Sequence, residues 1–408
     1  MATVDPKTLP VDSGLAKQLR AHVNFLAGPE LKGRKPGTAG HRTAADYITA
    51  RFQEIGLQPL PSLNRYGQPV SDELGDNLIG ARLSAGGETD SERESRWVLI
   101  GAHYDHLGES LLGNVYAGAD DNAAAVAILM ELARALPALP NHPVLFVAFN
   151  TEEPPFIRTP LMGSQVFVDH LPSEIGSPAN LHAVIIMDLM GGAYWEPLKD
   201  TIFAVGAEKS PGLYRRIRAA SVQSSSLSTH SSALSTAFSI LPVGMHLLEE
   251  LPVVGRHPFS DYDAFRNASV PFLFLSAGRT PHYHQPTDLP DTLHYERMAT
   301  TVTWLDQVVR LIDQDREPYR FEPDRIELAD ELETLHALVE QASHKETQIP
   351  GTSLFSRYRL KLDARWLGRI SAESIMKSED RDEHLRRMEK ISIRVQCLLA
   401  NFYGCGLF

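Results

Sequence analysis

Short apolar runs bounded by turn residues recur along the first two thirds of the chain. Such runs, without polar alternation, predict strands that are covered on both faces, as in a parallel or mixed sheet. Apolar positions at helical spacing over residues 121–136 and 295–312 predict helices, and residues 14–57 predict two helices joined by a turn at 33–40. The alternation predicts an α/β fold: a mixed, mainly parallel central sheet flanked by helices. The expected strands are Asn77–Gly80, Trp97–Ile100, Val144–Phe149, Ala183–Met187 and Val270–Leu275.

The hydrophobic pattern weakens between residues 193 and 255 and changes character after residue 315. The weak stretch includes the Ser/Thr-rich segment 221–235 and is predicted to be a lid or a binding insertion rather than a core element. After residue 315, helical spacing marks one helix from Leu328 to Val339 and another from Leu385 to Phe402. We therefore expect a main domain over residues 1–314 and a C-terminal helical appendage over 315–408.

Charge and cysteine content narrow the classes of partner. The chain has 39 Lys and Arg against 51 Asp and Glu, a formal net charge of −12, which disfavours nucleic acid and anionic lipid as partners. The two cysteines, Cys397 and Cys405, exclude a thiol-based metal site or a disulfide framework. Neither a signal-like start nor an apolar run long enough for a membrane span is found, so we expect a cytoplasmic protein that makes no use of a membrane.

Acidic and imidazole side chains follow the predicted strands. Because the carboxyl ends of parallel strands share one crevice, these residues are expected to converge. Their carboxylates would repel one another unless cations neutralise them, and two divalent ions supply that compensation. Carboxylates mixed with imidazoles suit Zn²⁺, and Mn²⁺ or Co²⁺ less well. The residues are His103, Asp105, Asp120, Asp121, Glu152, Glu153, Asp188 and His284.

A two-metal site of this kind activates water for hydrolysis. Two ions about 3.5–4 Å apart lower the pKa of a shared water, and a carboxylate that binds no metal can carry its proton to the leaving group. The adjacent Glu152 and Glu153 offer one candidate for each role, ligand and general base.

Six ordered motifs resemble those of the co-catalytic zinc aminopeptidases, in the superfamily that also holds glutamate carboxypeptidases and glutaminyl cyclases. The resemblance extends over about residues 15–312, including the stretch from His22 to Pro59, and implies a zinc exopeptidase-like fold, a peptide substrate and two zinc ions. Residues 1–314 would then be a metallopeptidase catalytic domain. The motifs are His103-Tyr-Asp105, Gly118-Ala-Asp-Asp-Asn-Ala123, Thr151-Glu-Glu153, Met187-Asp188, Ser260-Asp-Tyr-Asp-Ala-Phe265 and Tyr283-His-Gln-Pro-Thr-Asp288.

Carried over residue by residue, the resemblance implies a role for each site residue. Asp120 would bridge the two ions, Glu152 would be the general base, and Asp105 would orient a ligand histidine. Asp121 and Asp288 would lie behind the ligands. The implied metal ligands are His103, Asp120, Glu153, Asp188 and His284.

The activity implied is that of an aminopeptidase, and three alternatives remain. They are a carboxypeptidase or other amidohydrolase using the same metals, a glutaminyl cyclase, which would use one zinc, and a non-catalytic binding protein on the same fold. The loop Pro154–Ser164 departs from the family's usual Gln-Gly-Leu-x-Gly-Ser, so side-chain preference is not implied. Arg158, Arg256 and Arg279 are candidates to bind a substrate carboxylate.

Several of these residues also have structural interpretations. His106 and His282 fit a ligand position by spacing, although the motifs select their neighbours. Glu152 and Glu153 could be acids at a helix start, and Asp261 could cap the helix after it. The apolar stripes after residue 315 must be buried, so we expect them to form a homo-oligomer interface, to cover the active-site mouth or to pack on the main domain.

Overall fold

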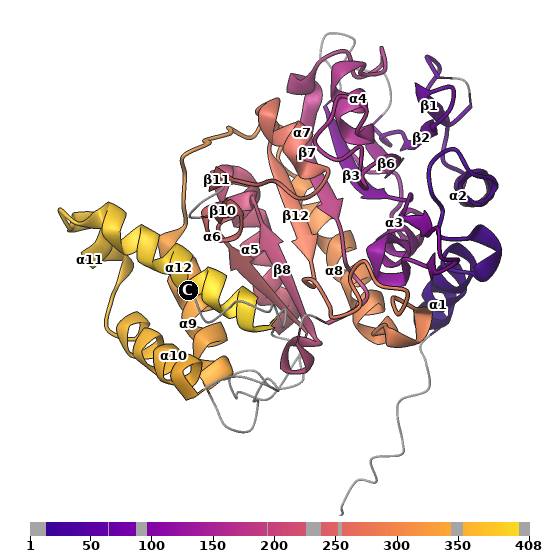
Figure 1. The fold of residues 1–408 in the computed structure, drawn as a ribbon. Coiled ribbons are helices and arrows are strands. Elements are labelled where there is room, and N and C mark those ends of the chain that lie inside the picture. Colours follow the sequence, from indigo (N-terminus) through magenta and orange to yellow (C-terminus); the bar gives the residue numbers. More distant parts are fainter. Residues whose placement is uncertain are drawn as a thin grey trace, which may run out of the picture.

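An eight-stranded sheet lies between two layers of helices in the computed structural model, which describes residues 14–63, 65–86, 96–193, 195–225, 238–251, 255–343 and 354–399 (Figure 1). The strand order is β1-β2-β6-β3-β7-β12-β8-β9. This arrangement confirms the predicted fold class. The strands are β1 (Gly67–Ser71), β2 (Gly75–Arg82), β3 (Trp97–His103), β6 (Val144–Phe149), β7 (Leu181–Met187), β8 (Thr201–Val205), β9 (Ser239–Val243) and β12 (Phe272–Ser276).

The four central strands run parallel and set the position of the site. β3 pairs in parallel with β6 and β7, and β7 pairs in parallel with β12. His103 at the end of β3 is opposite Phe149 at the end of β6, and Met187 of β7 is opposite Leu275 of β12. All five strands expected from the sequence are confirmed, and four of them end at the same edge of the sheet.

Helices on the first face are packed against every second side chain of the strands. Val98 and Ile100 of β3 belong to this layer, whereas Leu99 between them points to the other face, which explains the continuous apolar runs. Helix α3 is buried almost all round between the sheet and its neighbours. The layer consists of α1 (Gly14–Leu26), α2 (Ala39–Ile55), α3 (Ala125–Ala135), α5 (Pro211–Ser225) and α8 (Tyr295–Asp313).

The second face carries two short helices and the C-terminal helices. The short ones, α4 (Gly163–Asp169) and α7 (Tyr262–Asn267), contribute Phe167, Tyr262 and Phe265 to a core shared with Leu99. The C-terminal helices bury Leu335 and Val339 in the same core. Those helices are α9 (Leu328–Ser343), α10 (Leu354–Leu367), α11 (Ala372–Lys377) and α12 (Arg381–Leu399).

The prediction of a lid or insertion over residues 193–255 is wrong for most of the described part of that segment. β8 and β9 extend the central sheet, and α5 packs on its first face through Leu213, Ile217 and Ala220. Both strands have only five residues, and most of the described positions of β9 are half-buried, so their hydrophobic pattern is short and weak. Residues 226–237 and 252–254, which include much of the Ser/Thr-rich segment, lie outside the described residues.

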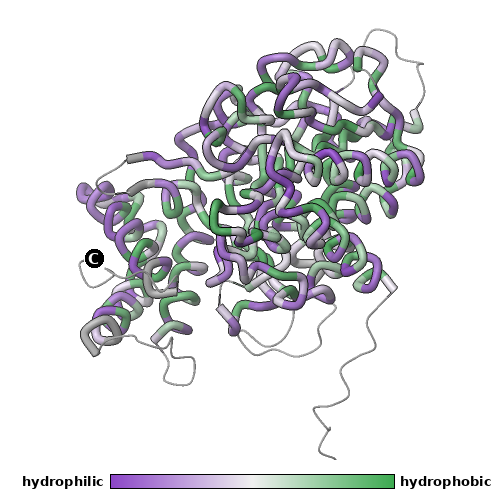
Figure 2. Tube along the Cα trace, turned by 45° about the vertical axis from the view of Figure 1, so that its right-hand side comes forward, coloured by the Kyte–Doolittle hydropathy of each residue, from purple (hydrophilic) through white to green (hydrophobic). Residues whose placement is uncertain are grey.

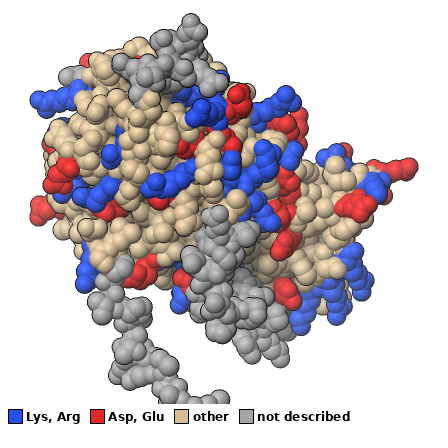
Figure 3. All heavy atoms as spheres, turned by 180° about the vertical axis from the view of Figure 1, so that it is seen from behind, with Lys and Arg blue, Asp and Glu red and all other residues tan. Residues whose placement is uncertain are grey.

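The apolar stripe of α9 is covered within the same chain. Leu328, Leu332, Leu335 and Val339 are all buried and share a core with Val243 of β9. Figure 2 shows hydrophobic positions concentrated in the interior and hydrophilic positions along the outer side of the C-terminal helices. Figure 3 shows Lys and Arg spread over the face seen from behind, with one group of them on the C-terminal helices. The division at residue 314 and a homo-oligomer through these helices remain predictions, and positions after residue 399 lie outside the described residues.

Two short strand pairs and one short helix lie outside the central sheet. β4 (Gly108–Glu109) and β5 (Val115–Tyr116) form a hairpin after β3, and β10 (Glu250–Leu251) pairs with β11 (Gly255–Arg256). Helix α6 (Met245–Glu249) follows β9. Among the described residues, none of the helices combines the length and the apolar character needed to cross a bilayer.

His246 of α6 links two C-terminal helices to the sheet. Its Nε2 lies 2.8 Å from the carboxylate of Glu331 in α9, and its Nδ1 lies 3.5 Å from that of Glu389 in α12. Burial works against the charged ring, but the two carboxylates outweigh it and raise the pKa of His246 to about 9.

We expect His246→Gln to destabilise the protein at pH 6 and to have little effect at pH 10. Because the folded pKa lies above the ordinary value, the stabilisation is complete below about pH 6.5 and is lost as the pH rises through about 9. A shift of this size corresponds to at most about 3 kcal/mol in the free energy of unfolding. Urea unfolding at both pH values measures it, with the exposed His170→Gln as control. An equal loss at both pH values would contradict this role.

Candidate metal centre

The loops that leave the carboxyl ends of the parallel strands meet at one place. β3 ends in His103, β6 leads to Glu152 and Glu153, β7 leads to Asp188, and the loop after β12 carries His284. Asp121 comes from a short distorted turn over Ala119–Ala124 that precedes α3. The convergence expected from strand order is therefore found.

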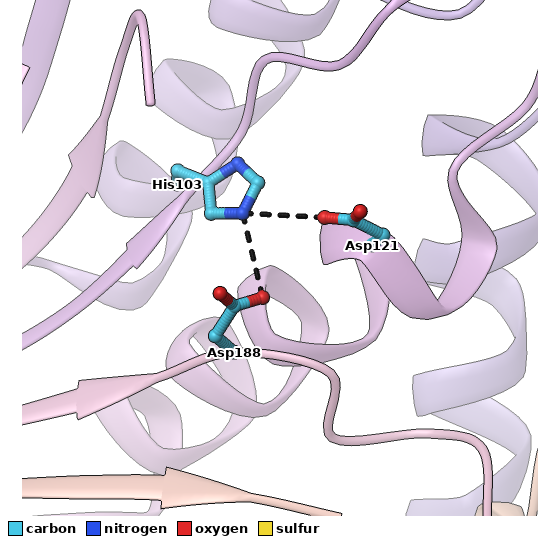
Figure 4. Close-up of side chains that lie close together, drawn as sticks. All are labelled: His103, Asp121 and Asp188. Atoms are coloured by element: carbon cyan, nitrogen blue, oxygen red, sulfur yellow. Dashed lines mark ion pairs between the residues drawn. The ribbon is translucent and has the colours of Figure 1, made fainter. Parts of the chain in front are cut away.

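The first cluster joins His103, Asp121 and Asp188 (Figure 4). The His103 Nε2 atom lies 3.3 Å from Asp121 Oδ1 and 3.5 Å from Asp188 Oδ1. All three side chains are buried. In Figure 4 both carboxylates point at the same ring nitrogen, which leaves one position that all three could coordinate.

The second cluster uses the other oxygen of Asp121. The His284 Nε2 atom lies 3.2 Å from Asp121 Oδ2 and 3.1 Å from Glu153 Oε2. His106 approaches from behind, and its Nδ1 lies 2.7 Å from Glu153 Oε1. His106, Asp121 and Glu153 also offer ligand atoms within 4.8 Å of one another. The hydrogen bond already engages His106, so His284 suits the ligand position better.

The bridging position expected for Asp120 is occupied by its neighbour Asp121. The carboxylate of Asp120 turns away from both clusters, and its Oδ1 accepts hydrogen bonds from the backbone N–H groups of Gly191 and Gly192 at 2.7 and 2.8 Å. Asp121, with φ −109° and ψ 88°, departs from helical geometry, and this turn aims its two oxygens at the two histidines. The prediction was wrong by one residue because the sequence does not show which of two adjacent carboxylates faces the site.

Two further carboxylates brace the backbone behind these clusters. Asp105 accepts hydrogen bonds from the N–H groups of Glu152 and Glu153 at 3.1 and 3.2 Å. Asp288 does the same for Asp120 and Asp121, at 2.8 and 3.1 Å. Each brace follows a cluster histidine closely in the sequence, so each histidine segment fixes a carboxylate segment from another loop.

The Nδ1 side of His103 faces its own loop. This nitrogen lies 3.6 Å from the carboxylate of Asp105 and 3.3 Å from the Asp105 carbonyl oxygen. An acceptor on that side leaves Nε2 with its lone pair toward a metal. The expected orienting role of Asp105 is compatible with these contacts and stays a prediction.

Backbone strain accumulates in the same loops. A positive φ is uncommon for residues with a side chain and costs about 1–3 kcal/mol where it occurs. Thr151, Leu189 and His284 adopt φ values of 55°, 55° and 54°. Thr151 precedes Glu152, Leu189 follows Asp188, and His284 is itself a cluster residue. Gly118, with φ 61°, begins the turn that carries Asp121. The surrounding hydrogen bonds hold these conformations in place.

Glu152 lies beside the first cluster without completing it. Its Oε2 is 3.7 Å from His103 Nε2, and its Oε1 is buried without a hydrogen-bond partner among the described residues. Burial raises the pKa of Glu152 well above its ordinary value, and the carboxylates of Asp188 and Glu153 add to this rise. Glu152 and Glu153 lie in a loop, so their interpretation as helix-start acids does not apply.

Two buried arginines, which the sequence analysis did not identify, partly offset this negative charge. Arg34 is fully buried and donates to the carbonyl oxygens of Tyr104 and Gly118, both at 2.9 Å. Arg297 donates to the carbonyl of Met190 at 2.9 Å. Burial lowers the pKa of each to about 10, so both stay charged at neutral pH. The only sequence signal for Arg34 was its place in the loop at 33–40.

The donor set fits divalent metal ions. A tetrahedral zinc ion with bonds of about 2.0–2.1 Å keeps its ligand atoms about 3.3 Å apart, and the distances in the two clusters are 3.1–3.5 Å. Several of these atoms are buried without a hydrogen bond among the described residues, an arrangement that is costly unless a cation binds there. They are His103 Nε2, Asp121 Oδ2, Asp188 Oδ1 and His284 Nε2.

The other residues singled out in the sequence have different surroundings. Arg256 pairs with Asp263, and His282 lies 2.9 Å from Thr287 Oγ1. Arg279 is exposed, and its guanidinium lies over the ring of Tyr283, 4.8 Å from the centroid. Asp261 begins α7 without a side-chain cap, is fully buried and has two carboxylate oxygens with no hydrogen-bond partner among the described residues. Its interpretation as a helix cap is therefore wrong.

Arg158 lies on the proline-rich loop after Glu153. Its guanidinium approaches His257 at 3.0 Å, on the exposed side of the loop. Of the three candidate arginines, only Arg279 meets two conditions together. It makes no ion pair with a carboxylate of the described chain, and it lies next to the cluster residue His284 through the ring of Tyr283.

One protein family and two bacterial proteins match parts of the chain. Peptidase family M28 matches residues 84–308. The chain is 31% identical to YfbL of Escherichia coli K12 over 231 residues, which are 53% of this chain and 66% of that protein. It is 31% identical to the alkaline phosphatase isozyme conversion protein of the same organism over 134 residues, 30% of this chain and 38% of that protein. The match thus spans less than two thirds of either relative.

Solved structures with a similar fold include two from bacteria. LapA of Legionella pneumophila superposes with a TM-score of 0.54 at 15% identity, covering 73% of this chain and 72% of LapA. The zinc aminopeptidase BSAP of Bacillus subtilis superposes with a TM-score of 0.53 at 15% identity, covering 72% of this chain and 94% of BSAP. At this identity the likeness concerns the fold alone.

We expect Asp121→Asn to lose both metal ions and Asp120→Asn to keep them. Asparagine preserves the size of either side chain, but at position 121 it removes the charge and one of the two oxygens that face the clusters, whereas at position 120 its amide oxygen still accepts from Gly191 and Gly192. Metal content per chain after dialysis measures the difference, with circular dichroism as the check on folding. Exchanged results would return the bridging role to Asp120.

Proposed function

The chain belongs to peptidase family M28, and on that premise we propose that it is a two-metal aminopeptidase that removes N-terminal residues from peptides. Family membership makes it a peptide hydrolase. The observation that carries the finer proposal is the geometry around Asp121, whose two oxygens face the imidazoles of His103 and His284, which are far apart in the sequence. A carboxylate placed in this way serves two ions at once.

The residues proposed to hold the ions form two sets that share Asp121. His103 and Asp188 complete one set, and Glu153 and His284 complete the other. When bound, a pair of divalent ions, of which zinc suits this donor set, supplies Lewis acidity and lowers the pKa of water at the site. The protein's own contribution is to keep the donors apart, buried and oriented through Asp105 and Asp288.

Glu152 is proposed as the general base. Its free Oε1 can accept a proton from the water that attacks the peptide carbonyl carbon, and can return that proton to the nitrogen as the C–N bond breaks. Burial, which raises the pKa of Glu152, makes its carboxylate a stronger base toward the water. Asp105 is then a positioning residue that fixes the backbone of Glu152.

Charge around the clusters supports recognition of an amine rather than of a carboxylate. The carboxylates of Glu152 and Asp261 are buried there without enough partners, which favours a positively charged substrate group. The nearby buried arginines, Arg34 and Arg297, are engaged with backbone carbonyl oxygens and are not free to bind a substrate carboxylate.

One observation favours a second candidate, a carboxypeptidase or dipeptidase. The exposed guanidinium of Arg279 stacks on Tyr283 near His284 and could pair with a substrate carboxylate. A glutaminyl cyclase with one zinc has no such support, because both clusters retain complete donor sets. The cytoplasmic location remains a prediction.

We expect about two zinc ions per chain and an absolute need for a free substrate amine. Metal analysis gives the first value. Turnover of one dipeptide in its free, N-acetylated and C-amidated forms gives the second: acetylation should abolish hydrolysis, whereas amidation should leave it largely intact. The opposite dependence would establish the carboxypeptidase alternative. A single ion with full turnover would refute the two-metal proposal.

We expect Glu152→Gln and Glu153→Gln to fail in different ways. Glu152→Gln should keep both ions and lower kcat by about 10²–10⁴, as expected for loss of general acid–base catalysis. Glu153→Gln should lower the occupancy of one ion, because it removes a ligand charge 3.1 Å from His284. Metal content and steady-state kinetics of both variants provide the comparison. Metal loss in the first variant and a metal-replete, inactive second variant would reverse the two roles.

A further inference from the structure

A large apolar cavity opens beside the candidate metal centre. It has a volume of about 340 Å³. Asp188 of the first cluster lines its inner end together with Tyr283, whose ring stacks on that of His284 with 3.8 Å between centroids. The cavity therefore begins where a substrate bound at the two clusters would have the group next to its scissile carbonyl.

The walls of the cavity come from two separate parts of the chain. The near walls are aromatic and aliphatic side chains of the sheet and its loops, among them Phe203 of β8 and Phe274 of β12. Helices α9 and α12 provide the far wall, and they lie alongside β9 and α6 (Figure 1). The far-wall residues are Leu335 and Leu338 of α9 and Ile393 and Val395 of α12.

Two polar side chains of the far wall, Glu331 and Gln396, are already engaged with neighbouring groups. Glu331 accepts from the Nε2 of His246 at 2.8 Å and from the backbone N–H of Glu327 at 3.2 Å. Gln396 donates to the carbonyl of Leu247 at 3.2 Å and to the Ser392 hydroxyl at 3.1 Å. These satisfied groups place no demand on a ligand. Asp188 and Arg279 also line the cavity, on the side of the clusters, so it is the part walled by α9 and α12 that favours an apolar occupant.

The far wall is held rigidly in place. His246 ties α6 to both α9 and α12, and an ion pair between Arg394 and Asp363 ties α12 to α10. These helices begin at Leu328, beyond the segment 84–308 that matches the family. The wall is thus a feature of this chain outside the matched peptidase segment.

The volume exceeds what one ordinary apolar side chain requires. A cavity of about 150 Å³ accommodates a benzene molecule with its six carbons. A volume of about 340 Å³ is more than twice as large, which corresponds to an apolar chain of about ten carbons once the substrate backbone occupies part of the mouth.

We propose that α9 and α12 close an elongated apolar subsite, and that this subsite selects substrates whose N-terminal residue carries a long apolar chain. The proposal rests on the aminopeptidase function proposed above and adds the substrate class. The C-terminal helices are then part of the binding site as well as of the core. The length of chain accepted is set by the distance between Asp188 and the far wall.

A series of 2-aminoacyl p-nitroanilides with unbranched side chains of four, six, eight and ten carbons tests the proposal on the metal-loaded full chain. Burial of each added methylene should raise kcat/KM about four-fold as long as the chain remains in the cavity. We expect the increase to continue to at least eight carbons. Hydrolysis of the four-carbon substrate with no gain beyond it would overturn the proposal.

A matched pair of variants locates the subsite. Leu338→Trp fills the far end of the cavity, whereas Glu340→Trp adds the same group on the exposed side of α9. We expect Leu338→Trp to lower kcat/KM at least ten-fold for the eight- and ten-carbon substrates and to leave the four-carbon substrate unchanged. Glu340→Trp should match the wild type throughout. Equal profiles for the two variants would exclude α9 from the subsite.

Binding of primary alkylamines separates this inference from the proposed function. Calorimetry with butylamine, octylamine and decylamine requires no turnover. Tighter binding of the longer amines, lost in Leu338→Trp, supports the subsite even if none of the anilides is hydrolysed, in which case only the aminopeptidase function fails. Equal affinity for butylamine and decylamine overturns the subsite whatever the enzyme hydrolyses.

Discussion

Eight carboxylates, none of them more than 7% exposed, share the carboxyl edge of the sheet, and charge burial on this scale constrains everything around it. Burying one unpaired carboxylate costs several kcal/mol even after the protein relaxes. Arg34 and Arg297 supply only two permanent positive charges nearby, so most of the compensation has to come from backbone N–H groups, histidines and bound cations. The eight are Asp105, Asp120, Asp121, Glu152, Glu153, Asp188, Asp261 and Asp288.

These carboxylates have two different structural roles. Asp105, Asp120 and Asp288 each accept hydrogen bonds from two backbone N–H groups of another loop. These bonds hold the ligand-bearing segments together. Asp121 and Asp188 keep oxygens that no donor among the described residues satisfies. The same charge type therefore serves both as brace and as ligand, and the local backbone decides which. Positive φ values at Thr151 and Leu189 are part of the cost of this arrangement.

Much of the fold and the location of the site could be predicted from the sequence, for a physical reason. Strands buried on both faces have to be continuous apolar runs, and polar residues directly after them have to meet at one edge. This reasoning found β2, β3, β6, β7 and β12, and the convergence of the loops that follow the last four of these strands. It failed at β8 and β9, whose hydrophobic runs are short; four of the five positions of the edge strand β9 are only half-buried.

Within the site, the sequence did not show the direction in which each side chain points. Asp120 and Asp121 have the same chemistry, and only the distorted turn before α3 aims one toward the histidines and the other toward Gly191 and Gly192. Arg34 was missed for a related reason: its guanidinium reaches carbonyls more than 80 residues away in sequence, at Ala117 and Gly118, and no local pattern encodes such a contact. Spacing identifies which residue types meet, but not which atoms face each other.

The division between ligand loops and edge strands also explains how one metal centre can serve different substrates. The proposed ligands lie in loops that follow the central parallel strands. Burial on both faces fixes these strands, and the hydrogen bonds of Asp105, Asp120 and Asp288 fix the loops. The cavity beside Asp188 is lined by the end of the central strand β12, by β8 and β9 at the margin of the sheet, and by the helices α9 and α12. Changes at the margin leave the carboxylate network untouched, because none of its braces reaches β8, β9 or the C-terminal helices. The far wall of the cavity is therefore separate from the carboxylate network, and its shape can vary without loss of the charge balance that the metal centre requires.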